Sequence, residues 1–369
     1  MSFRKPHCFI PVLVICFGFS GWGHCFREDK TIPALKESLR LDLGGEFDGS
    51  PVASIMDAAV GADGSIYILD NRGGRVLRFD GNGEFLGAFG RPGQGPGELQ
   101  RPLSLVRSTS GDIVVFDGHF SVFSGDGRFL KRYTGRAQSL IDAMFPAAGG
   151  GFLLSESRFR RTEKGVVLEK TIEKTGADFQ TARTLFRRSD EYSGGGKSSA
   201  SAFYSFTAGP AGELYVLDRS AKEYRILSLE PEGNFRPDIT RPYRPVAKCP
   251  EDLTDETRRQ KTAASRVAAM EGGSASPGGV NPEKFAVDDI AVDPSGRLWA
   301  ATHGADPCDR TVYIDVFGPD RGWVERYRLG AFVAPRLKIE GDSLYVFDSR
   351  PDDEILLVRY DLKSGKWAS

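Results

Sequence analysis

One short pattern recurs along the chain: a turn that contains glycine, then a strand-like run of Ile, Leu, Val and Tyr, then an aspartate. Four copies end in aspartate; they are Ile66–Asp70, Ile113–Asp117, Leu214–Asp218 and Leu344–Asp348. A looser copy, Leu298–Thr302, follows an Asp-Pro-Ser-Gly turn. Internal repeats of this kind indicate that each copy belongs to one structural unit, which buries its apolar side chains against neighbouring units.

The first copy sits in a complete unit. Strand-like segments at 55–60, 65–70, 75–79 and 84–89 are separated by short turns, and Asp80-Gly81-Asn82-Gly83 is typical of a hairpin turn with positive φ angles. Four strands joined by tight turns predict a four-stranded antiparallel sheet.

Comparable units follow along the chain, and the third is the least regular. The predicted units lie near 55–89, 103–133, 141–185, 203–235, 290–327 and 336–360. We therefore predict an all-β fold over residues 35–365, a six-bladed β-propeller of four-stranded antiparallel blades. Arrangement of the blades in a ring leaves few exposed strand edges.

The last unit has three clear strands, whereas an alternating segment at 38–43 precedes the first unit. We expect this N-terminal strand to complete the last blade and close the ring. The alternative is a frayed N-terminal arm.

An insertion at 236–284 interrupts the repeats and contains one predicted helix, Glu251–Met270, with a moderately apolar face. This helix is expected to cap the propeller or to offer a surface to a partner. Cys249 lies in the insertion and Cys308 in the fifth unit, and we favour a disulfide between them over two unpaired buried thiols.

Residues 1–25 have the features of a secretory signal peptide. Arg4 and Lys5 precede an apolar run, and small residues near positions 23 and 25 offer a cleavage site. Alternatives are an uncleaved membrane anchor and a lipoprotein attached at Cys25, for which His24 is unsuited. We expect a periplasmic or secreted protein with no membrane span after signal removal.

The charge of the chain bears on its partners. A formal net charge of -1 argues against nucleic-acid binding, which needs clustered Lys and Arg. Instead, we expect the protein to be a monomer whose partner is an unidentified protein or small-molecule ligand.

The glycine-rich segment Phe89–Leu99, followed by Pro102, resembles the NHL-repeat family of six-bladed propellers, and so does the segment Ile290–Trp299. The resemblance is close in the first, second and fifth units and covers most of residues 50–365 in pattern. It implies the fold but no single function, because members range from protein-interaction modules to lyases and lactonases. The glycine run lacks the Lys-Ser/Thr ending of a phosphate-binding loop, so we interpret it as a connection between blades.

The turns between the second and third strands of each blade should meet on one rim of the ring. On this rim we expect a ligand to contact the side chains of Arg72, His119, Arg219, His303 and Arg350. Aspartate commonly caps the backbone N–H groups of its own turn, and we favour this structural role for the aspartate that ends each copy. This role is expected for Asp70, Asp117, Asp218 and Asp348.

Few residues of the mature chain are suited to metal binding. Only His119 and His303 remain as histidines after signal removal, and the chain has four asparagines in all. We predict no catalytic residue, no metal and no cofactor, with calcium as the alternative. The sequence favours a binding or scaffold protein; the alternative is a propeller hydrolase or lyase, similar to lactonases, with a divalent cation at the channel mouth.

Overall fold

The computed structural model describes residues 32–52, 55–134, 140–163, 165–180, 182–192, 205–258, 261, 280–349 and 355–364. The expected signal peptide at 1–25 lies outside these residues. Among those described, no helix is long and apolar enough to cross a membrane.

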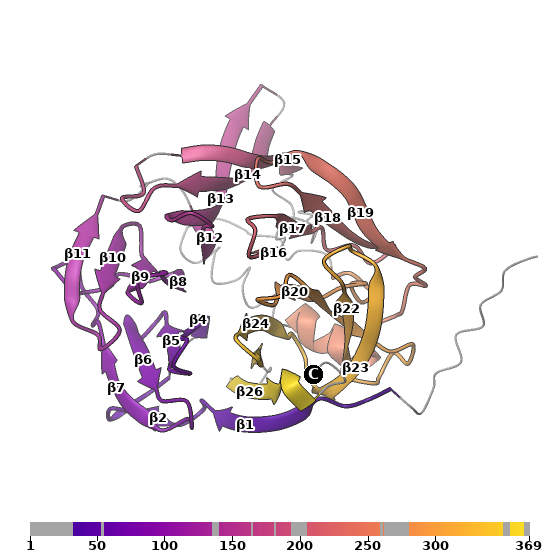
Figure 1. Ribbon diagram of the computed structural model, residues 1–369, viewed down its shortest axis with the longest axis horizontal. Coiled ribbons are helices and arrows are strands. Elements are labelled where there is room, and N and C mark those ends of the chain that lie inside the picture. The colour runs from indigo at the N-terminus through magenta and orange to yellow at the C-terminus, as the bar shows by residue number, and fades with distance from the viewer. Residues whose placement is uncertain are drawn as a thin grey trace, which may run out of the picture. The chain divides into compact units, whose positions relative to one another are not determined.

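Six four-stranded antiparallel sheets form the blades of a propeller, as predicted (Figure 1). Blade 1 comprises β4 (Ile55–Val60), β5 (Ile66–Asp70), β6 (Arg75–Phe79) and β7 (Phe85–Phe89), and blade 2 comprises β8 (Ser104–Arg107), β9 (Ile113–Phe116), β10 (Phe120–Phe123) and β11 (Phe129–Tyr133). Blade 3 comprises β12 (Leu140–Pro146), β13 (Phe152–Thr162), β14 (Gly165–Thr175) and β15 (Ala182–Tyr192), and blade 4 comprises β16 (Ser205–Ala208), β17 (Leu214–Leu217), β18 (Tyr224–Leu229) and β19 (Phe235–Arg241). Blade 5 comprises β20 (Asp289–Val292), β21 (Leu298–His303), β22 (Thr311–Phe317) and β23 (Trp323–Ala331).

Blade 6 is assembled from both ends of the ring. Strands β24 (Arg336–Glu340), β25 (Ser343–Ser349) and β26 (Ile355–Asp361) are completed by β1 (Lys36–Asp42), which pairs antiparallel with β26. Figure 1 shows β1 beside β26, where the chain closes the ring. The expectation that an N-terminal strand completes the last blade is confirmed. A small hairpin of β2 (Glu46–Phe47) and β3 (Ser50–Pro51), which the sequence did not predict, follows β1.

The hydrophobic core lies between adjacent blades. One cluster, for example, packs Tyr67 and Leu69 of blade 1 against Leu105, Val115 and Phe123 of blade 2. Alternating apolar side chains of each strand therefore face the neighbouring blade on both sides, which explains why one unit could not fold alone. Tight turns support this packing: Gly127 has a φ of +93°, and a Cβ there would lie 2.6 Å from the ring of Phe89.

The innermost strands are also joined to one another by polar contacts. The carboxylate of Asp57 in blade 1 accepts hydrogen bonds from Leu105 N (2.9 Å) and Ser104 Oγ (3.2 Å) in blade 2. The carboxylate of Asp289 in blade 5 accepts one from Leu337 N in blade 6 (2.7 Å) and one from Ser205 Oγ in blade 4 (2.5 Å). These contacts hold neighbouring blades together around the axis.

Two blade boundaries differ from those predicted. In blade 3, β15 extends to Tyr192, past the expected end at 185, and β13, β14 and β15 each have 11 residues. In blade 4, β19 continues to Arg241, past the expected end at 235, although it contains Pro237. Because β19 is an outer strand, one of its edges has no partner strand, and proline is tolerated there. The insertion therefore begins after Arg241 rather than at 236.

The predicted helix in the insertion begins close to its expected position. Residues 250–258 and residue 261 are helical, whereas 259–260 and 262–279, which include the rest of the expected helix, lie outside the described residues.

Candidate functional site

The antiparallel order of strands places two kinds of connection on one side of the ring. The turn from the second to the third strand of each blade and the link from each outer strand to the next inner strand both lie there. We call this side the connection face. Arg72, His119 and Arg219 lie in such turns, and His303 is the last residue of the strand β21 before one. Arg350 lies outside the described residues.

The aspartates that end the repeated pattern use their carboxylates in different ways. Asp70 is fully buried, accepts a hydrogen bond from Gly73 N in its own turn (3.1 Å) and pairs with Arg75 Nε (3.2 Å). Asp117 accepts from His119 N in its own turn (3.3 Å) and from Gln100 N in the incoming connection (2.9 Å). Both residues thus hold backbone donors of the connection face.

The two remaining aspartates act across greater distances along the chain. Asp348 accepts hydrogen bonds from Val333 N (3.0 Å) and Ala334 N (2.8 Å), which belong to the link between blades 5 and 6. Asp218 forms an ion pair with Arg188 Nη1 of blade 3 (2.7 Å). Its observed contact therefore connects two blades.

Arg72, Arg101 and His119 form what we call the blade 1–2 patch. Asn71 Nδ2 donates to Pro102 O (2.7 Å), and Gln100 N donates to Asp117 (2.9 Å), so residue 101 lies between the turns that carry Arg72 and His119. All three side chains are exposed. Sequence reasoning identified Arg72 and His119 but missed Arg101, which belongs to the glycine-rich connection rather than to a repeated turn.

Arg219, Asp288, Lys284 and His303 form what we call the blade 4–5 cluster. Arg219 comes from the blade 4 turn, Asp288 immediately precedes β20, and Lys284 belongs to the end of the insertion. Each of these side chains is partly buried. The structure thus places the predicted residues Arg219 and His303 in one half of the connection face and Arg72 and His119 in the other.

The imidazole of His303 is held by the backbone. Its Nε2 lies 2.8 Å from Phe285 O and its Nδ1 lies 2.9 Å from Gly304 O, and Tyr243 Oη is 3.4 Å from Nε2. Burial lowers the pKa of His303, while these carbonyl oxygens act in the opposite direction. With both ring nitrogens beside carbonyl oxygens, His303 positions the end of the insertion against blade 5.

Asp288 has an unusual electrostatic environment. Burial raises the pKa of Asp288 to about 6, even though the positive charges of Arg219 and Lys284 act to lower it. No hydrogen bond to its carboxylate is found in the part of the chain that the structure describes. Burial also lowers the pKa of Lys284, whose ammonium donates to the carbonyl oxygens of Asp309 (3.0 Å) and Asp306 (3.4 Å).

Arg219 carries a buried donor without a partner in this cluster. Its Nε is buried and has no hydrogen-bond partner among the described residues. Buried donors are nearly always paired, so such an atom calls for an explanation. Arg219 influences the pKa of Asp288, yet the two side chains form no ion pair in the described structure.

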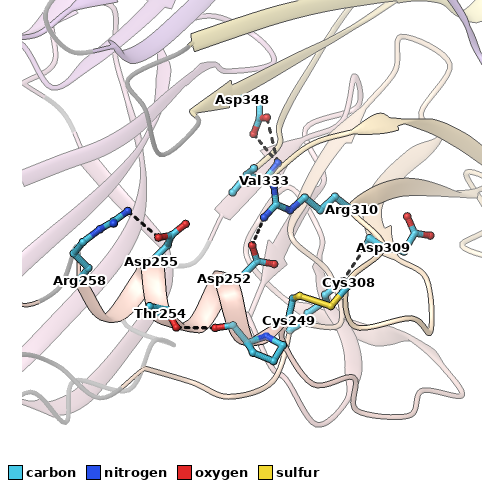
Figure 2. A network of polar contacts seen from close by, with 12 residues as sticks. Cys249, Asp252, Thr254, Asp255, Arg258, Cys308, Asp309, Arg310, Val333 and Asp348 are labelled. Carbon is cyan, nitrogen blue, oxygen red and sulfur yellow. Dashed lines mark hydrogen bonds and ion pairs between the residues drawn. A yellow bond between two sulfur atoms is a disulfide. The ribbon is translucent and has the colours of Figure 1, made fainter.

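The insertion is attached to blade 5 by a cysteine pair and an ion pair (Figure 2). The sulfur atoms of Cys249 and Cys308 lie at disulfide distance, with their Cα atoms 4.8 Å apart, and Arg310 Nη2 pairs with Asp252 Oδ1 at 2.7 Å. Lys248 N donates to Pro282 O (2.8 Å) and joins the two ends of the insertion. The helical segment is thus anchored to the turn of blade 5 that follows His303.

Blade 3 contains a buried cation that sequence reasoning missed. Lys170 in β14 is only 1% exposed, and burial lowers its pKa to about 8, against the attraction of Asp142 and Asp190. Asp142 in turn accepts a hydrogen bond from Ser157 Oγ. A Lys in an alternating strand gives no sign of burial by itself, because its depth depends on the neighbouring blade.

Metal ligands do not gather in the described part of the chain. Among those residues no group of three or more His, Cys, Asp or Glu side chains is arranged to hold a metal ion. An open hollow beside the helical segment is lined by Leu253, Thr254, Thr257, Arg258 and Lys261.

Comparisons with known proteins add little beyond the fold. No family model matches the chain, and no curated protein matches it. Similar solved structures include a streptogramin B lyase, at 13% identity and a TM-score of 0.46, covering 87% of this chain and 97% of that one. A protein of Bacteroides fragilis NCTC 9343 proposed to be exported matches at 14% identity and a TM-score of 0.49, covering 89% and 95%.

A third similar structure is virginiamycin B lyase from Staphylococcus aureus. It has 11% identity to this chain and a TM-score of 0.40, and the match covers 87% of this chain and 98% of the lyase. Likenesses of this size carry no information on activity.

Proposed function

We propose that this chain is an exported binding protein that holds a small polar ligand, or the end of a peptide, at the blade 4–5 cluster. The observation that carries the proposal is the presence of two neighbouring opposite charges that form no ion pair: the guanidinium of Arg219, whose buried Nε has no hydrogen-bond partner among the described residues, and the carboxylate of Asp288. A ligand that offers an acceptor to Arg219 and a donor to Asp288 would satisfy both groups.

Physical chemistry supports binding at this position over the remaining turns. An unsatisfied buried donor costs about 1–3 kcal/mol, so a ligand that supplies its partner recovers that free energy. Binding sites commonly combine partial burial with a few polar groups of this kind. Arg72 and His119, by contrast, are exposed on the opposite half of the face.

A screen of thermal stability tests the proposal. The melting temperature of the purified chain is measured in the presence of amino acids, amides, dipeptides and sugars. The affinity of each compound that raises the melting temperature is then measured by calorimetry for the parent protein, Arg219→Gln and Lys222→Gln. Lys222 is an exposed residue of the same turn, so its variant loses the same charge without touching the cluster. We expect at least tenfold weaker binding in the Arg219 variant alone, since a hydrogen bond to a charged group contributes about 1.5–3 kcal/mol. Equal affinity in all three proteins would refute the assignment.

A second candidate function is catalysis at the same position. A carboxyl group with a pKa of about 6 can take up and release protons near neutral pH, as general acid–base catalysis requires. The corresponding activity would be that of a hydrolase or lyase, with a divalent cation such as calcium at the channel mouth. Elemental analysis of protein purified without chelators tests this: one calcium per chain, retained through gel filtration, would favour the enzyme.

Export and family membership complete the proposal. The basic and apolar residues at 1–25 and the Cys249–Cys308 pair support a periplasmic or secreted location. Edman sequencing of the mature protein should find an N-terminus near residue 24 or 26.

We also propose that the chain is a divergent member of the NHL-repeat propellers. The glycine-rich link between blades 1 and 2 supports this, since Leu99 is buried there and Leu99 N donates to Arg91 O (2.8 Å).

A further inference from the structure

A strained residue marks the centre of the blade 1–2 patch. Arg101 has a φ of +56°, a left-handed conformation that is uncommon for residues other than glycine, asparagine and aspartate. Such strain persists where surrounding contacts impose it, and it is found most often at functional positions. Here the contacts are those of its neighbours: Gln100 N is bound by Asp117, and Pro102 O is bound by Asn71. The arrangement holds the Arg101 side chain on the surface between two turns.

The patch carries two arginine charges that have no ion-pair partner among the described residues. No hydrogen bond or ion pair joins the side chains of Arg72, Arg101 or His119 to other residues in the described part of the chain. Of the carboxylates in the same turns, Asp70 pairs with Arg75, whereas Asp117 accepts backbone N–H groups of residues 100 and 119 and keeps its own charge. Glu98 pairs with Arg91 at 2.8 Å.

We propose that the blade 1–2 patch docks an acidic peptide segment of a partner protein. The patch spans two blades and is exposed rather than enclosed, which suits an extended chain with several carboxylates better than a single small anion. It does not suit a lipid surface, because the exposed large apolar side chains of these blades, Leu86 and Leu130, lie near the starts of outer strands, toward the opposite face. This surface is separate from the blade 4–5 cluster and does not depend on the ligand proposed there.

Binding of a defined acidic probe tests the proposal. Fluorescein-labelled octaglutamate is titrated with the full chain, and anisotropy is followed at about 0.02 M and about 0.2 M salt, which differ severalfold in screening. We expect binding that weakens as salt rises and is about tenfold weaker in Arg72→Gln/Arg101→Gln. Arg128→Gln is the matched control, since Arg128 is exposed on the same blade but in a turn of the opposite face.

Further arms make each outcome decisive. Arg101→Gly removes the charge and the strain together, so it should bind as weakly as Arg101→Gln while melting at the same or a higher temperature. Equal loss in the Arg128 variant, equal binding of octaglutamine, or no binding at low salt would overturn the proposal. Full competition by inorganic phosphate at a concentration matched to the peptide's would indicate a simple anion site, and that result would also overturn it.

Discussion

Arg336 in the inner strand of blade 6 donates a hydrogen bond from Nη1 to the carbonyl oxygen of Met56 in the inner strand of blade 1, at 2.9 Å. Lys338 Nζ, two residues further along the same strand, lies 3.1 Å from Asp57 Oδ1. The ring is thus closed twice, by pairing of β1 with β26 at the outside of blade 6 and by these side chains at the axis.

Removal of the Asp57 carboxylate should loosen the axis. Asp57→Ala leaves the buried Leu105 N without an acceptor and frees Lys338, so we expect the free energy of unfolding to fall by about 2–3 kcal/mol. Urea denaturation followed by tryptophan fluorescence measures this loss. Asp342→Ala is the control, because its pair with Lys363 is exposed and should contribute little to stability. Similar midpoints for the two variants would contradict a role of Asp57 in closure.

The cysteine pair should stabilise the insertion. In the chain-entropy view a closed loop of this length, with a sequence separation of 59, contributes up to about 4 kcal/mol. Because the insertion lies outside the blades, we expect Cys249→Ser/Cys308→Ser to be cut rapidly within the insertion by a protease while the blades stay intact. Mass spectrometry of the digest gives the cut sites. Fragmentation throughout the blades at the same rate would show that the pair stabilises the entire ring.

The raised pKa of Asp288 predicts a pH dependence of stability. Its folded pKa of about 6 exceeds the unfolded value, so the folded state binds the proton more tightly. This contribution favours folding at low pH and is lost as pH rises from about 4 through 6. Asp288→Asn cannot ionise and so does not lose this contribution. The free energy of unfolding of the variant should therefore rise relative to that of the parent by about 1 kcal/mol from pH 5 to pH 8. The expected change is modest because the side chain is partly solvated.

Melting curves across this pH range test the prediction. Asp218→Asn is a useful comparison, since Asp218 lies in the blade 4 turn and pairs with Arg188. A gap between Asp288→Asn and the parent that does not grow with pH would count against the proposed environment of Asp288.

The blades could be predicted because their signals are local. Runs such as Ile66–Asp70 alternate between two buried faces, and turns such as Asp80–Gly83 allow one hairpin geometry. Even the closing strand β1 could be identified, since blade 6 lacked a fourth strand.

The boundaries that were wrong have physical reasons. Pro237 reads as a strand breaker, but the free edge of β19 accommodates it. Residues 187–192 are polar and lie beyond the predicted end of the third unit at 185, yet they pair with β14 throughout. In both outer strands, pairing with the neighbouring strand of the blade thus outweighed the local sequence composition.

The candidate site was predicted only in part, because its residues meet through the order of the blades. Arg219 and His303 followed from the repeated turns, whereas Asp288 and Lys284 lie in a segment without a repeat. Whether a charge there is paired, and how deeply it is buried, depends on the insertion folding back onto blade 5. Arg101 was missed for a similar reason, since its conformation is imposed by contacts from two turns.

The aspartate of the Asp-Pro-Ser-Gly turn in blade 5 should be important for stability. The Asp293 carboxylate accepts hydrogen bonds from Arg297 Nε (2.7 Å), Trp299 Nε1 (2.9 Å) and Ser295 N (2.9 Å). Burial alone would raise its pKa, but these hydrogen bonds outweigh burial and lower the pKa of Asp293. The buried Trp299 indole, which stacks on Tyr327, depends on this acceptor.

Asp293→Ala should therefore lower the free energy of unfolding by about 3–4 kcal/mol at pH 7, because it leaves a buried indole N–H and a partly buried guanidinium without their acceptor. A depressed pKa stabilises the folded state above the unfolded value of about 4, and this stabilisation is lost as pH falls through the folded pKa. The difference between parent and variant should thus shrink below about pH 4. Asp320→Ala, in an exposed turn of the same blade, is the control. Urea midpoints that differ equally at pH 7 and pH 3 would show that the charge of Asp293 contributes nothing, and that the loss comes from packing around Trp299 alone.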